Sequence, residues 1–97
     1  MKHVLWTQEA EDSFYEIVDY LNENWTEREY LNFESETHGI IAIITKHPYI
    51  YPATDHDKNV RKAVMMKLIS VYYRVDDHKV TLLLFWNNTR NPESLNL

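Results

Sequence analysis

Residues 60–86 contain three stretches rich in β-branched and aromatic side chains, with only short breaks between them. The stretches cover 60–66, 68–76 and 79–86, and the residues between them suit tight turns. Such closely spaced strands pair in an antiparallel manner with their neighbours along the chain. The second half of the sequence therefore predicts a three-stranded antiparallel meander.

The middle stretch has two different faces, because successive side chains of a strand point to opposite sides. One face is apolar and contains Ile69, Val71, Tyr73 and Val75; the other contains Ser70, Tyr72 and Arg74. Helices must cover the apolar face, so we expect Tyr72 and Arg74 on the opposite face.

The first half of the chain begins with a short strand at 3–6 and continues with a helix. Thr7 is a good N-cap, and acidic residues follow it at the positive end of the helix. The helix should end near 22–25. Its apolar face is formed by Ala10, Phe14, Ile17, Val18 and Leu21.

A second helix begins at Thr26, which forms a capping box with Glu29. Lys46-His47-Pro48 ends it. Its inward face contains Tyr30, Phe33, Thr37, Ile40, Ile41 and Ile44. Gly39, the single glycine of the chain, lies inside this helix, and we expect close backbone approach to the first helix or the sheet to compensate for its poor helix propensity.

These elements predict one domain over 1–97, an α+β two-layer sandwich with an N-terminal strand, a helical hairpin and a meander. The first strand should lie beside the last one. The predicted core between helices and sheet contains Phe14, Ile17, Leu21, Phe33, Ile40, Ile44, Val71, Tyr73, Leu82 and Leu84.

The composition excludes several classes of protein. Without cysteine there are no disulfides, thiolate nucleophiles or cysteine-ligated zinc. No apolar run is long enough to cross a bilayer, and the first residues do not resemble a signal peptide, so we expect a cytoplasmic protein without membrane contact. The net charge of −5 is uneven, because residues 1–47 hold ten acids and only three lysines or arginines.

Motifs for classical catalysis are missing from the sequence. One glycine cannot make a phosphate-binding loop, and no serine sits in a nucleophile elbow. Asp55-His56-Asp57 fits turn chemistry better than a metal site, because no second ligand pair accompanies it. We therefore expect no metal and no cofactor.

Four cations at strand ends remain as candidate functional residues: Arg61, Lys62, Arg74 and Arg90. In a meander, Arg61 and Arg74 should be neighbours, with Arg90 at the other end of the sheet. Arginine at such positions suits phosphate or carboxylate recognition through bidentate hydrogen bonds. A surface salt bridge, or stacking on Tyr72, is the structural alternative for each arginine.

The order of these features resembles the RelE/ParE family of toxin–antitoxin toxins. The resemblance extends over nearly the whole chain and rests on WTQEAEDSFYEIVDYL (6–21), the proline after the second helix, and VRKAVMMKLISVYYRVDDHKVTLLLFWNNTRNP (60–92). It implies the fold derived above. It also implies a bacterial cytoplasmic toxin of a plasmid-stabilisation module, neutralised by a cognate antitoxin protein.

The family has two functional branches. RelE-like members are ribosome-dependent endoribonucleases, which cleave messenger RNA without a metal; ParE-like members inhibit DNA gyrase by binding. Here Arg90 matches the family's arginine after the last strand. Met65 stands about where the RNases place a sheet arginine, and the tail after Arg90 has no tyrosine or histidine.

These departures favour a ParE-like toxin that binds its target and is not an enzyme. The resemblance then assigns target binding to Arg90, Arg74, Arg61 and Tyr72. Exposed aromatic residues beside the helical seam, namely Trp25, Tyr15 and Tyr20, are the candidates for antitoxin binding. Two alternatives stay open: an endoribonuclease that uses Arg61, Lys62, Arg74 and Arg90, and an attenuated relative that binds only its antitoxin.

Overall fold

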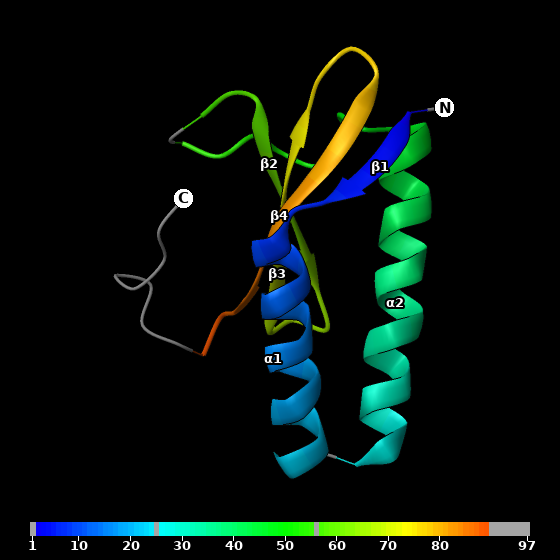
Figure 1. Ribbon diagram of the computed structural model, residues 1–97, viewed down its shortest axis with the longest axis vertical. Helices are drawn as coiled ribbons and strands as arrows, with labels where there is room; N and C mark the ends of the chain where they lie inside the picture. Colours follow the sequence, from blue (N-terminus) through cyan, green and yellow to red (C-terminus); the bar gives the residue numbers. More distant parts are fainter. Residues whose placement is uncertain (1, 25, 56, 90–97) are drawn as a thin grey trace.

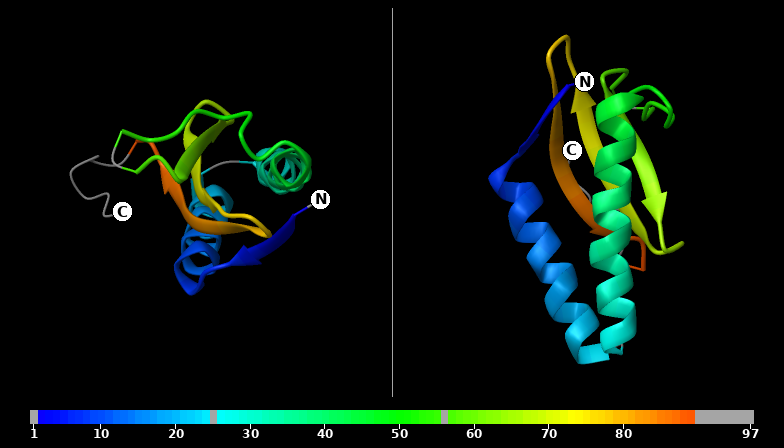
Figure 2. Two further views of the ribbon diagram at one scale, coloured as in Figure 1. Left: turned by 90° about the horizontal axis from the view of Figure 1, so that it is seen from above. Right: turned by 90° about the vertical axis from the view of Figure 1, so that its right-hand side faces the viewer.

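The computed structural model describes residues 2–24, 26–55 and 57–89. A single four-stranded sheet has the strand order β1-β4-β3-β2, and two helices cover one of its faces (Figures 1 and 2). This confirms the predicted α+β sandwich. The elements are β1 (His3–Trp6), α1 (Gln8–Asn24), α2 (Glu27–Lys46), β2 (Val60–Met65), β3 (Ile69–Val75) and β4 (Lys79–Asn87).

The strand pairing is the one predicted for the meander and for the N-terminal strand. β2 pairs with β3, and β3 with β4, in antiparallel fashion. β1 runs parallel to β4, with Val4 opposite Val80. The helical hairpin makes this parallel return possible, because it carries the chain away from the sheet and back.

Both helices begin with the predicted caps. Thr7 Oγ1 accepts a hydrogen bond from the Ala10 backbone nitrogen at 3.0 Å. Thr26 and Glu29 form a complete capping box, in which each side chain accepts a hydrogen bond from the other residue's backbone nitrogen. The two caps fix where the chain leaves β1 and where it turns between the helices.

The main core lies between the helices and the sheet. Aromatic rings form its centre: the Phe14 ring is 5.1 Å from the Phe33 ring and 5.3 Å from the Phe85 ring, centroid to centroid. Phe33 is fully buried, whereas Phe14 is only partly buried. The other predicted core residues that this cluster contains are Ile17, Leu21, Ile40, Ile44, Val71, Tyr73 and Leu82.

Leu84 is the exception, and a β-bulge explains it. Tyr72 lies opposite Leu84 but Tyr73 lies opposite Leu82, so Leu83 is an extra residue in β4. A bulge of this kind reverses the alternation of the side chains that follow it. The prediction that Leu84 belongs to the core under the helices was therefore wrong. Leu84 packs on the other face of the sheet, in a second cluster with Val60, Tyr72 and Trp86.

Gly39 does not allow a close approach of two backbones. A Cβ atom built on this residue would meet nothing within 4 Å, and the residue is exposed. The expectation of close packing at this glycine was therefore wrong. Its low helix propensity is not offset by any contact that a side chain would prevent.

Candidate functional site

The strand register separates the cations that the sequence places near one another. Arg61 lies opposite Tyr73, and Val60 lies opposite Arg74. Directly opposed side chains share a face, so Arg61 is on the helix side of the sheet and Arg74 is on the other side. The expectation that Arg61 and Arg74 are neighbours was wrong.

Arg61 holds the loop that joins α2 to β2. Its guanidinium donates hydrogen bonds to the backbone oxygens of Tyr49 and Tyr51, the first at 3.2 Å, and lies 4.9 Å from the centroid of the Tyr49 ring. The Tyr73 hydroxyl donates to the Pro48 oxygen of the same loop at 2.9 Å. The described contacts therefore give Arg61 a structural role.

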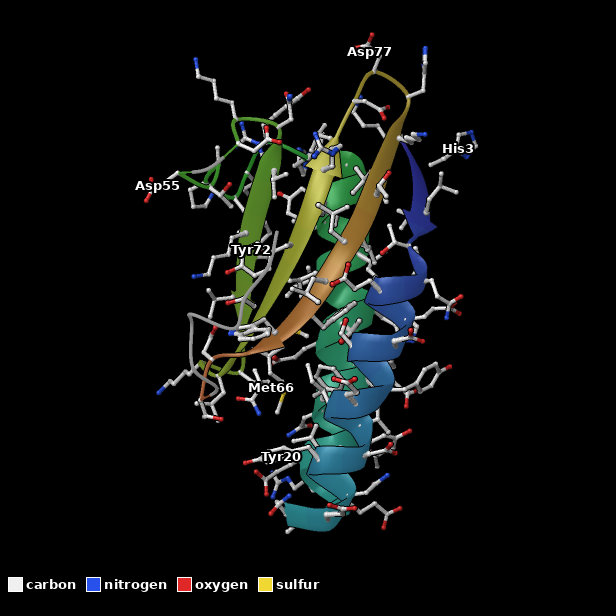
Figure 3. The ribbon with its side chains drawn as sticks, turned by 60° about the vertical axis from the view of Figure 1, so that its left-hand side comes forward. His3, Tyr20, Asp55, Met66, Tyr72 and Asp77 are labelled. Atoms are coloured by element: carbon white, nitrogen blue, oxygen red, sulfur yellow. The ribbon has the colours of Figure 1, made fainter. Side chains whose placement is uncertain are left out.

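The face of the sheet away from the helices brings together Lys62, Tyr72 and Arg74. Figure 3 labels Tyr72 on this face. The Lys62 ammonium is 6.0 Å from the centroid of the Tyr72 ring, at the outer limit of a cation–π contact. Arg74 Nη2 donates to Asp57 Oδ2 at 3.2 Å, and both side chains are more than a third exposed. An exposed pair of this kind contributes about 0–1 kcal/mol, so a binding partner can displace it at little cost.

Tyr72 is 6% exposed and belongs to the second apolar cluster. Burial raises the pKa of its phenol. A tyrosine is protonated at neutral pH in any case, and the raised pKa makes this one still less suited to act as a general base. Together, Lys62, Tyr72 and Arg74 define what we call the sheet-face patch.

Met65 does not occupy a position on this face. It lies opposite Ile69, is 4% exposed, and its sulfur is 3.8 Å from Thr37 Oγ1 in α2. Met65 therefore points into the core, and its correspondence to an RNase sheet arginine stays a prediction. The neighbouring β2 position on the face away from the helices is Val64, which is 52% exposed.

The acidic loop before β2 provides structural contacts. Asp57 Oδ1 accepts a hydrogen bond from the Asn59 backbone nitrogen at 2.8 Å, while its other oxygen pairs with Arg74. These are the turn contacts that the sequence predicts for an aspartate in a loop. Within the described part of the chain, no three histidine or acidic side chains converge in a manner that could hold a metal ion.

Two of the candidate residues, Arg90 and Trp25, lie outside the described residues, as does His56. Their assigned roles stay predictions. The remaining candidates for antitoxin binding are Tyr15 and Tyr20, whose side chains are 61% and 39% exposed.

Tyr15 and Tyr20 line different cavities. Tyr20 lines a cavity with Phe85, Asn87 and Thr89, on the sheet side of α1. Figure 3 shows Tyr20 toward the far end of that helix. Tyr15 lies in a groove between the two helices. The structure therefore does not place these two tyrosines on one surface.

The interhelical groove lies between α1 and α2, and Trp6 at the end of β1 also lines it. Figure 1 shows the two helices separating from their connection toward β1. The cavity measures about 530 Å³. The remaining residues that line it are Glu11, Phe14, Tyr15, Val18, Tyr30, Glu34, Thr37, His38 and Ile41.

Charge in the groove is negative. A hydrogen bond to Glu34, together with the negative charge of that carboxylate, raises the pKa of Tyr30. Glu11 is exposed on the opposite helix. Two acids thus border a surface that is otherwise mostly apolar or aromatic.

Three residues that line the groove were not predicted from the sequence as part of a binding surface: Trp6, Tyr30 and Glu34. Tyr30, Glu34 and His38 recur every four residues and so form a stripe along one side of α2. This spacing could have indicated that the three side chains share a surface. Trp6 could not be recognised as a groove residue from the sequence. A tryptophan at the end of an edge strand is surrounded by the same sequence pattern whether it is buried or, as here, 37% exposed.

No protein-family model matches the sequence, and no curated protein matches it. Among solved structures, the chain is similar to one described as "Chromosomal ParDE TA system from P. aeruginosa". The TM-score is 0.73, and the alignment covers 90% of this chain and 96% of the other.

The chain has a RelE/ParE-like fold. The predicted resemblance to this family is thus confirmed at the level of the fold, where sequence identity is 15%. Within the described residues, neither helix is both long and apolar enough for a membrane span.

Proposed function

We propose that this chain is the toxin of a type II toxin–antitoxin module, that it acts in the cytoplasm by binding its target, and that a cognate antitoxin neutralises it. The observation that carries the proposal is the shared fold. The alignment with a chain of the ParDE TA system leaves little of either chain uncovered. A fold serves many functions, so the site residues must support the same conclusion.

Binding fits the described cations better than RNA cleavage does. Cleavage through the RNA 2′-hydroxyl requires groups that stabilise a crowded phosphate and groups that move protons. Arg61 donates to loop carbonyls on the helix side of the sheet, and Arg74 pairs with Asp57 on the other side. Burial raises the pKa of the Tyr72 phenol above its ordinary value, which makes this group less suited to exchange protons near neutral pH.

The sheet-face patch is the proposed target-binding surface, with Arg90 as a further predicted member. Arginine is a frequent anchor of protein interfaces, and Arg74 is the exposed arginine of this patch, whereas Tyr72 is 6% exposed. Arg74 can exchange its exposed carboxylate partner for one on a target. DNA gyrase is the target that the family resemblance implies.

Two assays on the purified chain and on induced cells test this function. The chain should inhibit supercoiling by gyrase in vitro, and primer extension on messenger RNA from induced cells should show no new cleavage. Cleavage within codons, with supercoiling unaffected, would instead support the endoribonuclease. If neither effect is seen, the proposed toxic function would be wrong, and the remaining alternative is an attenuated relative that binds only its antitoxin.

Arg74→Ala tests the patch itself, and Arg28→Ala is a matched control. Both arginines are exposed, but Arg28 lies at the start of α2, away from the sheet face. Arg74→Ala should weaken inhibition, whereas Arg28→Ala should not. Equal inhibition by the two variants would remove Arg74 from the target-binding surface.

A further inference from the structure

We propose that the interhelical groove binds a basic amphipathic helix of a partner protein. The proposal deepens the proposed function, since the antitoxin is the expected partner, and it assigns both the place and the charge of the docking segment. An amphipathic helix recognises a groove by inserting apolar side chains spaced three or four residues apart. The charge of the groove then determines which helices fit.

The floor of the groove is apolar and held in place. Phe14, Val18 and Ile41 are partly buried and pack against the main core. Phe14 also contacts Trp6 edge to face at 5.5 Å between ring centroids. A floor formed by the core needs little rearrangement on binding, which lowers the entropic cost of association.

The rim of the groove supplies aromatic contact area. Trp6 is 37% exposed and Tyr15 is 61% exposed, and the ring of each contacts the Phe14 ring edge to face. Tryptophan and tyrosine are enriched among the residues that dominate binding energies. A cavity of about 530 Å³ can accept a few large apolar side chains, as expected for a helix that inserts its anchors.

The charge of the helices selects a basic partner. Glu11 and Glu34 border the groove, one on each helix. Around them, the helices carry only two cations, Arg28 and Lys46, and Lys46 lines another cavity at the far end of α2. The acids of the two helices are Glu9, Glu11, Asp12, Glu16, Asp19, Glu23, Glu27, Glu29, Glu34 and Glu36.

The same charges disfavour other occupants. Nucleic acid would bring its phosphates against Glu11 and Glu34, whereas its binding sites are basic. A second copy of the chain would place one acidic hairpin on another, and like charges facing each other across an interface are costly. A helix with lysines or arginines beside its apolar stripe meets both requirements of the groove.

Two synthetic peptides test the charge preference with the intact chain. Both have leucine at helical spacing; one carries lysine at every flanking position, and the other carries glutamate there. Fluorescence anisotropy of a labelled peptide should show the basic peptide binding at least about tenfold more tightly. Equal affinities, or preference for the acidic peptide, would overturn the proposal.

A pair of double variants tests the location. Glu11→Gln with Glu34→Gln removes the two acids of the groove, and Glu23→Gln with Glu36→Gln makes the same charge change at exposed positions that do not line it. The groove variant should bind the basic peptide about tenfold more weakly than the control variant. Equal weakening would show a general charge effect, and the proposed site would be wrong.

Tyr15→Ser distinguishes insertion into the groove from attraction to its rim. Tyr15 is largely exposed, so its loss should barely affect folding, which circular dichroism can verify. Weakened peptide binding would support docking at the groove, whereas unchanged binding would contradict it. These peptide measurements do not depend on toxicity. The groove proposal can therefore be wrong while the proposed function is right, and the proposed function can be wrong while the groove proposal is right.

Discussion

Ser13 Oγ accepts a hydrogen bond from the Phe85 backbone nitrogen at 2.9 Å and thereby joins α1 to β4 just after the bulge. The same hydroxyl donates to the Ala10 oxygen at 3.1 Å. Nearby, Thr7 Oγ1 lies 3.1 Å from the Leu82 oxygen. The N-cap of α1 and a serine within α1 thus hydrogen-bond to the backbone of β4 where β1 ends and beyond that point.

Ser13→Ala should destabilise the chain by about 1–3 kcal/mol, because it leaves the buried Phe85 nitrogen without an acceptor. Urea unfolding measures the change. Ser35→Ala, at an exposed position of α2, is the matched control and should shift the free energy of unfolding by no more than about 0.5 kcal/mol. Equal effects would mean that the Ser13 bond contributes nothing to stability.

Phe33→Ala should lower the free energy of unfolding by about 3–5 kcal/mol. Phe33 is fully buried and its ring stacks on Phe14. Leu31→Ala, two residues earlier and 53% exposed, should cost much less. A loss below about 1 kcal/mol for Phe33→Ala in urea unfolding would show that this residue does not belong to the core.

Gly39→Ala should stabilise the chain by about 0.5–1 kcal/mol. The added methyl group would meet no atom within 4 Å, and alanine loses less conformational entropy in a helix than glycine does. Thermal unfolding should show a higher Tm. A lower Tm would mean that the exposed glycine has a role that its surroundings do not reveal.

Alkaline pH should destabilise the chain through Tyr73. Burial raises the pKa of its phenol to about 12, from an ordinary value near 10.0. Between these values the folded chain keeps a proton that the unfolded chain releases, so stability falls as pH rises. Tyr73→Phe removes this contribution, and its free energy of unfolding should decline less steeply over the same pH range. Identical slopes would contradict the assignment.

Periodicity and capping residues predicted most of the helices and strands. The alternation along β3, the helical faces of α1 and α2, and the two N-caps all describe local chemistry that the structure retains. The place of β1 followed from topology, because a helical hairpin returns the chain to the sheet. Apart from the place of β1, these features are determined by residues close together in the sequence.

The bulge could not be predicted from the sequence. Leu82 to Trp86 are all large and apolar, so no polar residue marks the change of face at Leu83. The turn between β2 and β3 is similarly unmarked. Met66 and Lys67 have φ values of 53° and 64°, a conformation usually signalled by glycine or asparagine.

The candidate site was predictable only in part. Residue alternation correctly placed Tyr72 and Arg74 on one face. The expected pairing of Arg61 with Arg74 was wrong, because strand ends alone do not give the side to which a side chain points. The interhelical groove depends on how two helices diverge, which is a property of packing and not of either helix alone.

Growth after induction tests the central claim most directly. Cells that express this chain alone should stop growing, and co-expression of the protein encoded beside it should restore growth. The control is the same vector with a frameshift early in the coding sequence. Growth equal to that control, while the folded chain accumulates to a level detectable by immunoblot, would contradict the proposal that this protein is a toxin.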